Sequence, residues 1–140
     1  MQLAREAHRR DWRATSDEST GDKQAATVTK TWQKSASLLA PSSIHAEVPI
    51  GDGAKERIDL LDDRDLTAYE LKNSGKNPHH EFFKDIFKVI TYNHNHPVKI
   101  RKLVFITELA GIERLKKNGL AQAVIASAQD FGIAIELETT

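Results

Sequence analysis

Two short apolar segments of this 140-residue chain carry charges where buried strands usually carry none, and these charges restrict how the segments can pack. The segments are Arg57–Leu61 (RIDLL) and Ala68–Lys72 (AYELK), and a short acidic turn lies between them. An ionised side chain in apolar surroundings is costly unless it is paired or bound to a metal. We therefore expect Asp59, Glu70 and Lys72 to face one another, with two carboxylates available to a hard divalent cation and an ammonium beside it.

The length of the turn decides whether these charges meet, because side chains alternate along a strand. A two-residue turn pairs Asp62 with Asp65. This register sets Asp59 opposite Ala68 and diagonal to Glu70, on the same face of the hairpin. Diagonal neighbours lie about 7–8 Å apart, a gap that one cation can bridge with two carboxylates. A three-residue turn would put Asp59 on the other face.

The remaining pattern predicts an α/β domain over residues 22–140, after a polar N-terminal segment of residues 1–21 that is compatible with flexibility. In that segment a short helix fits Leu3–Trp12, and Ser16–Asp22 is typical of a loop. The domain is expected to begin with a helix over Lys23–Leu39, capped by Asp22, and three strands over Ile44–Ile50, Arg57–Asp62 and Leu66–Lys72. A helix over His79–Tyr92 and a strand over Lys99–Thr107 follow. The last elements are a helix over Gly111–Asp130, interrupted at Gly119 and with Gly132 as its C-cap, and a strand over Ile133–Leu137. The first three strands favour an antiparallel meander, and each later strand follows a crossover helix. The result is a mixed central sheet flanked by helices.

Composition excludes some functions and locations. The chain has no cysteine, so disulfides, thiolate metal sites and cysteine catalysis are excluded. The N-terminus lacks the apolar core of a signal peptide, and no apolar run reaches membrane-spanning length, so we expect a reducing, intracellular location without a membrane partner.

Charge is divided unevenly along a chain whose formal net charge is zero. Residues 47–70 hold eight acids and three bases, whereas residues 71–102 hold seven bases and two acids. An acidic centre beside a basic segment suits a metal site that also holds a polyanion. Charge blocks that average out on a solvated surface are the alternative.

Asp59 and the tripeptide Glu70-Leu71-Lys72 together resemble the signature of the PD-(D/E)XK phosphodiesterase superfamily, which has the restriction-endonuclease-like fold. That signature is an Asp on the second core strand and an acid-x-Lys on the third. The family's αβββαβ core also matches the order of elements read above, with an additional C-terminal helix and strand here. The resemblance covers residues 23–138 and implies a metal-dependent endonuclease that hydrolyses nucleic-acid phosphodiester bonds.

The resemblance implies a division of roles within the site. Asp59, Glu70 and the backbone carbonyl of Leu71 would coordinate Mg²⁺, for which Mn²⁺ would substitute. Lys72 would orient or help deprotonate the attacking water and offset charge in the transition state. DNA is the favoured substrate and RNA remains open. Cutting both strands of a duplex needs two sites, so a homodimer or a larger nuclease complex is expected.

Several further residues are secondary candidates. The family often adds an acid from its first helix, which this chain lacks; Glu47, Glu6 or Glu18 are the alternatives, and Glu47 is equally compatible with a solvent-facing strand position. Some branches of the family carry Gln-x-x-x-Tyr on the helix after the acid-x-Lys strand, and this chain has Lys88 and Tyr92 at that spacing. The candidates for nucleic-acid contacts are Lys76, Lys84, Lys88 and Tyr92, with Lys84 and Lys88 on the polar side of their helix.

Two other patterns favour structural roles. Asn93–Pro97 (NHNHP) has no partner ligands elsewhere and predicts a surface turn rather than a metal site. Phe82, Phe83 and Phe87 are expected in the core rather than on a base-stacking platform. Two alternatives to the enzyme remain open: an idle nucleic-acid-binding module of the same fold, and an interaction protein in which Lys72 only neutralises the acids.

Overall fold

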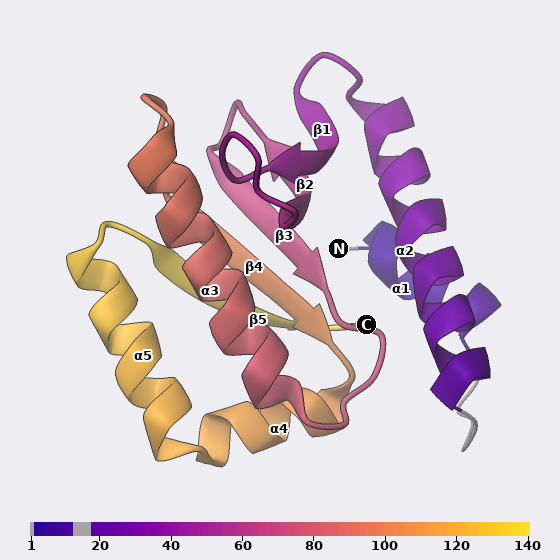
Figure 1. Cartoon of the computed structure of the whole chain (residues 1–140). Coiled ribbons are helices and arrows are strands. Elements are labelled where there is room, and N and C mark those ends of the chain that lie inside the picture. Colours follow the sequence, from indigo (N-terminus) through magenta and orange to yellow (C-terminus); the bar gives the residue numbers. More distant parts are fainter. Residues whose placement is uncertain (1, 13–17) are drawn as a thin grey trace.

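A computed structural model describes residues 2–12 and 18–140, which form one five-stranded mixed sheet with helices on both faces (Figure 1). The strands lie side by side in the order β1-β2-β3-β4-β5; β1, β2 and β3 are antiparallel, and β3, β4 and β5 are parallel. The elements are α1 (Gln2–Asp11), α2 (Glu18–Leu39), β1 (Ile44–Pro49), β2 (Arg57–Asp62), β3 (Thr67–Leu71), α3 (Pro78–Asn95), β4 (Lys102–Thr107), α4 (Leu109–Lys117), α5 (Gly119–Asp130) and β5 (Ala134–Thr139).

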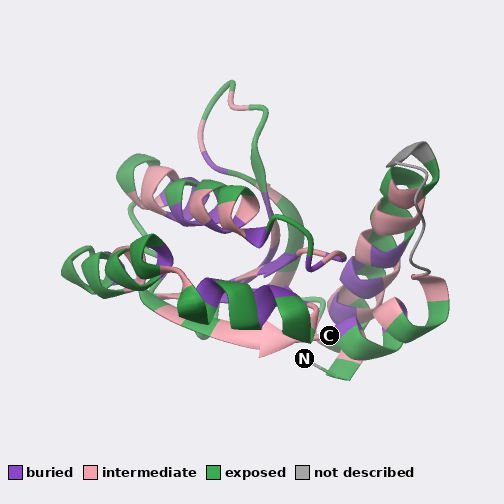
Figure 2. Ribbon diagram, turned by 90° about the horizontal axis from the view of Figure 1, so that it is seen from below, coloured by how far each residue is buried: buried purple, intermediate pink, exposed green. Residues whose placement is uncertain are grey.

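Two hydrophobic clusters, one on each face, hold the helices to the sheet. Helices α3, α4 and α5 cover one face, where Phe82 and Leu115 pack with Phe105 of β4. Helices α1 and α2 cover the other, where Trp32 packs with Val104. In Figure 2 the buried sides of the helices face the sheet. In the part of the chain described, no helix has both the length and the apolar content to cross a membrane.

The N-terminal helix belongs to the core of the domain. Ala4 and Ala7 of α1 are buried beside Val28 of α2. Helix α2 begins at Glu18, so Asp22 lies inside the helix and is not its cap, contrary to prediction. The expected Ser16–Asp22 loop falls partly outside the described residues, and its described part is helical.

Most predicted elements are confirmed, and the long C-terminal helix is divided where a polar side chain can cap it. Asn118 separates α4 from α5, and its Oδ1 accepts a hydrogen bond from the Ala121 amide at 2.8 Å. The predicted stop at Gly132 is also confirmed: its φ of 72° lies in the region that favours glycine.

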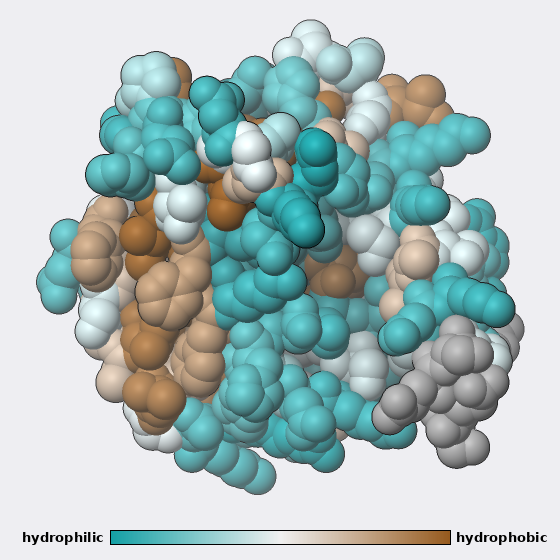
Figure 3. Space-filling model, viewed as in Figure 1, coloured by the Kyte–Doolittle hydropathy of each residue, from teal (hydrophilic) through white to brown (hydrophobic). Residues whose placement is uncertain are grey.

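One predicted core residue lies on the surface. Phe82 is fully buried, whereas Phe87 is 67% exposed. Phe87 lines an apolar groove of 440 Å³ between α3 and α5, together with Leu120 and Phe131. Figure 3 shows this hydrophobic band over the two helices. The helical period predicted an apolar stripe, but the stripe is wider than the surface that the sheet covers.

The close approach of two glycines gives a first prediction. A Cβ atom on Gly111 of α4 would lie 2.8 Å from Thr107 Cγ2 and 3.1 Å from the Gly75 Cα. We therefore expect Gly111→Ala to lower the free energy of unfolding by about 1–3 kcal/mol through overpacking. Gly119→Ala is the matched control, because a Cβ atom at that position would meet no described atom within 4 Å beyond its chain neighbours and the nearby backbone of its own helix. Urea unfolding of both variants measures the difference, and equal stabilities would contradict this account of the contact.

Candidate functional site

The β2–β3 hairpin brings Asp59 and Glu70 together, but in a different register from the one predicted. Asp62 pairs with Thr67, so the turn spans four residues rather than two. Leu66 belongs to this turn, with a φ of 53°, and its carbonyl accepts a hydrogen bond from the Arg101 amide at 2.8 Å. The two-residue turn and the diagonal placement were therefore wrong. The four-residue turn preserves the alternation, and continuing the observed register brings Asp59 directly opposite Glu70.

Asp59 lies where β2 and β3 stop pairing through their backbones. The last recorded pair is Leu60 with Tyr69. Beyond it, the Leu71 amide donates to the Asp59 carboxylate (Oδ2) at 2.9 Å, and the Asp59 carbonyl accepts from Gln33 Nε2 at 3.0 Å. Burial raises the pKa of Asp59 to about 6, although the Leu71 hydrogen bond acts in the opposite direction.

Glu70 is a buried carboxylate at the centre of the sheet, with 2% of its surface exposed. Its Oε2 lies 2.7 Å from Lys88 Nζ, whereas its Oε1 has no hydrogen-bond partner among the described residues. Burial, followed by the nearby charges of Asp85 and Asp59, raises the pKa of Glu70 well above its ordinary range. Glu70 therefore depends on Lys88 at Oε2 and, when one of the two carboxyl groups holds a proton, on a hydrogen bond with Asp85.

Lys88 supplies the ammonium next to Glu70. Its Nζ donates to Glu70 Oε2, to Asp85 Oδ1 at 2.8 Å and to the Arg57 carbonyl at 2.9 Å. Burial alone would lower the pKa of Lys88, but the two carboxylates outweigh it and raise the pKa above its ordinary value. Burial also raises the pKa of Asp85. The expected position of Lys88 on the exposed side of its helix is wrong.

Lys72 points toward α3 rather than toward the two predicted carboxylates. Its Nζ lies 3.5 Å from Glu81 Oε1, and 34% of its side chain is exposed. The structure thus brings Asp59 and Glu70 together as predicted, and it sets the ammonium of Lys88, not that of Lys72, against Glu70.

Of the candidates for an additional acid, Glu47 lies on β1, the strand next to the one that carries Asp59. The β1–β2 register sets Glu47 opposite Asp59, where its charge helps to raise the pKa of Asp59 after the larger effect of burial. Glu47 is exposed, has a φ of 53°, and accepts a hydrogen bond from Gln33 Nε2 at 2.6 Å. Glu6 is exposed and bonds to Gln2 at 2.9 Å, and the Glu18 side chain lies outside the described residues.

The residues predicted to contact nucleic acid have different surroundings. Lys76 is exposed in the loop between β3 and α3, and exposed Lys84 lies 3.2 Å from Glu56. Lys88 is buried as described, and Tyr92 is buried with its ring stacked on His96 at a centroid distance of 3.9 Å. A phosphate could reach Lys76 and Lys84 at the surface, but not Lys88 or Tyr92 in this arrangement.

The sequence patterns did not identify Asp85 as a site residue, although its position in the helix indicates a buried charge. Asp85 lies three residues after Phe82 and four before Val89, inside the apolar stripe of the helix. A charge inside such a stripe is expected to have a buried partner. Lys88 follows three residues later and meets that need.

The residues around Glu70 offer the carboxylate oxygens that a hard cation prefers, but they do not form a complete metal site. Across the described ranges, no three His, Asp or Glu side chains form a group that could hold a metal ion. Glu70 nevertheless has a buried oxygen that no described residue meets with a donor, and Asp59 and Asp85 are close enough to shift its pKa. Carboxylate oxygens are the preferred ligands of Mg²⁺.

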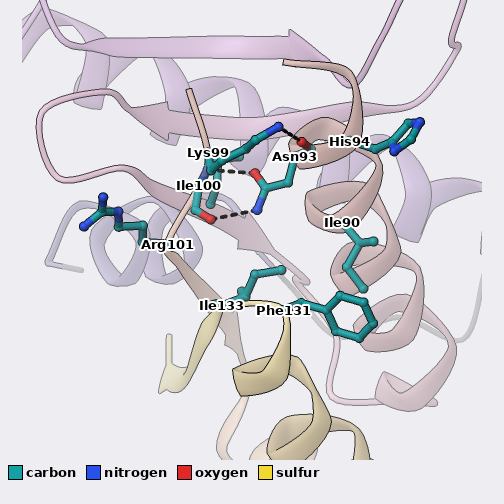
Figure 4. Close-up of a pocket in the computed structure, with 9 residues that line it drawn as sticks. Ile90, Asn93, His94, Lys99, Ile100, Arg101, Phe131 and Ile133 are labelled. Atoms are coloured by element: carbon teal, nitrogen blue, oxygen red, sulfur yellow. Dashed lines mark hydrogen bonds between the residues drawn. The ribbon is translucent and has the colours of Figure 1, made fainter. Parts of the chain in front are cut away.

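The predicted surface turn over Asn93–Pro97 is only partly confirmed, because α3 continues through Asn95 and only His96 and Pro97 lie beyond the helix. Figure 4 shows the Asn93 side chain directed at the backbone of Ile100, where Nδ2 donates to the carbonyl at 2.8 Å and Oδ1 accepts from the amide at 2.7 Å. Lys99 Nζ donates to the carbonyls of Asn93 and His96. These bonds fix the path of the chain into β4 beside a pocket of 740 Å³ that Arg101 also lines.

Comparison of the chain with models of known protein families, with curated proteins and with solved structures finds no match.

The buried ion pairs of Lys88 give a second prediction. Lys88→Met leaves two buried carboxyl groups without their counter-charge, and breaking such a pair costs about 3–5 kcal/mol. Lys84→Met is the matched control one helical turn earlier, because exposed pairs such as Lys84–Glu56 contribute about 1 kcal/mol or less. Urea unfolding at pH 7 compares the two variants. Equal losses would show that Lys88 is not the buried counter-charge.

The raised pKa of Asp59 predicts how stability depends on pH. The folded state binds its proton up to about pH 6, whereas the ordinary pKa is 3.8. Between these values the folded state holds more protons than the unfolded state, so this contribution to stability falls as pH rises. Asp59→Asn should therefore gain stability relative to wild type between pH 4 and pH 7, by no more than about 3 kcal/mol.

The exposed residue Asp52, in the turn before β2, provides the control for this pH series. Urea unfolding of Asp52→Asn and wild type at each pH gives the baseline for a carboxylate outside the buried cluster, and the change for Asp59→Asn is measured against it. A constant difference for Asp59→Asn relative to this baseline would contradict the assignment of the pH effect to Asp59.

Proposed function

We propose that this protein is a Mg²⁺-dependent endonuclease that hydrolyses phosphodiester bonds, with DNA as the favoured substrate. The observation that carries the proposal is the pair of carboxylates on neighbouring strands, Asp59 and Glu70, the second of which has a buried oxygen with no donor among the described residues. A site of this kind gains a partner for its unsatisfied oxygen when a hard cation binds. Perturbed pKa values in one cluster of carboxyl groups also favour a functional site.

The order of the elements supports the same function by analogy. A helix, three antiparallel strands, a crossover helix and a parallel fourth strand follow one another from α2 to β4. This order agrees with the αβββαβ core expected from the resemblance to PD-(D/E)XK nucleases. The analogy concerns the arrangement of the core, and the function itself is argued from the site.

In the proposed reaction the residues of the chain hold the metal ion and orient the attacking water. Asp59, Glu70 and the Leu71 carbonyl would hold Mg²⁺, which supplies Lewis-acid polarisation of the phosphate and a more acidic water when bound. Lys72 lies one residue beyond β3 and would orient the attacking water, for which its ammonium would have to turn from Glu81, now 3.5 Å away, toward the carboxylates. The hydrogen bond from the Leu71 amide fixes the Asp59 carboxylate relative to β3.

An idle nucleic-acid-binding module is the second candidate, and one observation favours it. The Lys88 ammonium already neutralises part of the negative charge around Glu70. A site that is permanently neutralised in this way would need no metal. The two functions differ in their response to Mg²⁺.

The enzyme hypothesis predicts cleavage that requires both Mg²⁺ and the strand residues. Wild type should cut at least one substrate in a panel of plasmid, single-stranded, branched DNA and RNA. Lys72→Ala and Glu70→Gln should lower the rate by about 100-fold or more, because the first removes the ammonium that orients the water and the second removes a metal ligand. Mg²⁺ should also raise the melting temperature of wild type but not of Asp59→Asn.

The matched control is Lys117→Ala, at an exposed position at the end of α4, which should cleave as wild type does. If Lys72→Ala and Glu70→Gln still cleave, the active site lies elsewhere in the protein. Nucleic-acid binding without cleavage and without a thermal response to Mg²⁺ would establish the idle module instead.

A further inference from the structure

The side of α3 that packs on the sheet carries charged residues at helical spacing. Glu81, Asp85 and Lys88 are separated by four and three residues, so they lie on one side of the helix. Their contacts agree: Glu81 pairs with Lys72, and Lys88 pairs with Glu70 and Asp85. Helix α3 thus adds a carboxylate and an ammonium to the carboxylates of the strands.

The ammonium of Lys88 lies in a cage of oxygen atoms. Its three donors meet Glu70 Oε2 at 2.7 Å, Asp85 Oδ1 at 2.8 Å and the Arg57 carbonyl at 2.9 Å. Two carboxylates and a backbone carbonyl are also the kinds of ligand that a hard divalent cation takes. The ammonium therefore lies where a cation would find its ligands.

The charges around this position are not balanced. Asp59, Glu70 and Asp85 carry three negative charges when ionised, and Lys88 provides one positive charge. The three carboxyl groups outnumber the one ammonium, and a divalent cation would offset more of their negative charge than the ammonium does. Independently of the charge count, Glu70 Oε1 is buried without a donor in a side chain that is 2% exposed, and the Glu70 and Asp85 carboxyl groups lie within hydrogen-bond reach of each other when one of them holds a proton. Such an atom is costly unless a ligand or a proton meets it.

We propose that α3 completes the divalent-cation site, with Asp85 as its third carboxylate and Lys88 as an internal counter-ion that the cation displaces. This inference rests on the function proposed above and extends its site from the strands to the helix. Displacement of the Lys88 ammonium frees Glu70 Oε2, Asp85 Oδ1 and the Arg57 carbonyl together. Lys88 holds the carboxylates close to one another until the cation arrives.

Mn²⁺ binding to the purified full-length chain, followed by the electron paramagnetic resonance of free Mn²⁺, tests the role of Asp85 without any activity assay. We expect Asp85→Asn to raise the Kd by at least about tenfold, as loss of a group in or around a metal site does. Asp52→Asn should stay within about twofold of wild type, because that carboxylate is exposed and outside the cluster.

The outcomes separate this inference from the proposed function. If Asp59→Asn and Glu70→Gln lose Mn²⁺ while Asp85→Asn binds it as tightly as wild type, Asp85 is not a ligand, and the site on the strands stands. If wild type itself binds no Mn²⁺, the proposed function fails and the inference fails with it.

The counter-ion role of Lys88 makes a second, opposite prediction in the same assay. Lys88→Met should bind Mn²⁺ several-fold more tightly than wild type, because the cation no longer competes with the ammonium. Mn²⁺ should also raise the melting temperature of this variant more than that of wild type. Weaker binding would overturn the counter-ion role. Should Lys88→Met not fold without metal, Lys88→Gln keeps an N–H donor for Glu70 and allows the same comparison.

Discussion

The ion pair between Lys88 of α3 and Glu70 of β3 fixes how the crossover helix sits on the sheet. Apolar contacts from Phe82 and Val89 hold α3 against the strands, but burial of apolar surface has no preferred direction. A buried ion pair does have a preferred position, because a shift of the helix by one residue would leave both Glu70 and Lys88 without a partner. Removal of one partner costs much more than the pair contributes, so the pair favours one register over its alternatives. The positions of Asp85 and Glu81 over the sheet follow from that register.

The Lys88–Glu70 pair does not neutralise all the acidic groups buried at the centre of the sheet. One ammonium faces three carboxylates, and burial raises the pKa of Asp59, Glu70 and Asp85 alike. A domain selected only for stability would replace such a cluster with apolar side chains, since well-packed apolar substitutes are often neutral or stabilising. Perturbed pKa values in one buried cluster are common at functional sites, and the cluster therefore supports the proposed cation site.

Local patterns predicted the elements and the face that Asp59 and Glu70 share, because strand alternation and helical periodicity are properties of neighbouring residues. They did not predict the turn length, because the positive φ of Leu66 depends on a hydrogen bond from Arg101, 35 residues later. The burial of Lys88 was missed for a similar reason. Its spacing from Lys84 suggested a shared polar side, whereas its partner Glu70 lies on β3, 18 residues earlier. Contacts between residues far apart in the sequence determine both the turn length and the burial of Lys88, so local patterns could not predict them.

The uneven distribution of charge along the chain has a different meaning in three dimensions. Ion pairs with acids take up four of the seven bases between residues 71 and 102, namely Lys72, Lys84, Lys88 and Lys102. The basic segment therefore largely neutralises acids of this domain and presents less positive surface to a polyanion than its composition suggests. Phosphate contacts give nucleic-acid binding most of its non-specific affinity. We therefore expect that the proposed nuclease would hold its substrate with the help of a second copy or a partner, an assembly that cleavage of both strands also requires.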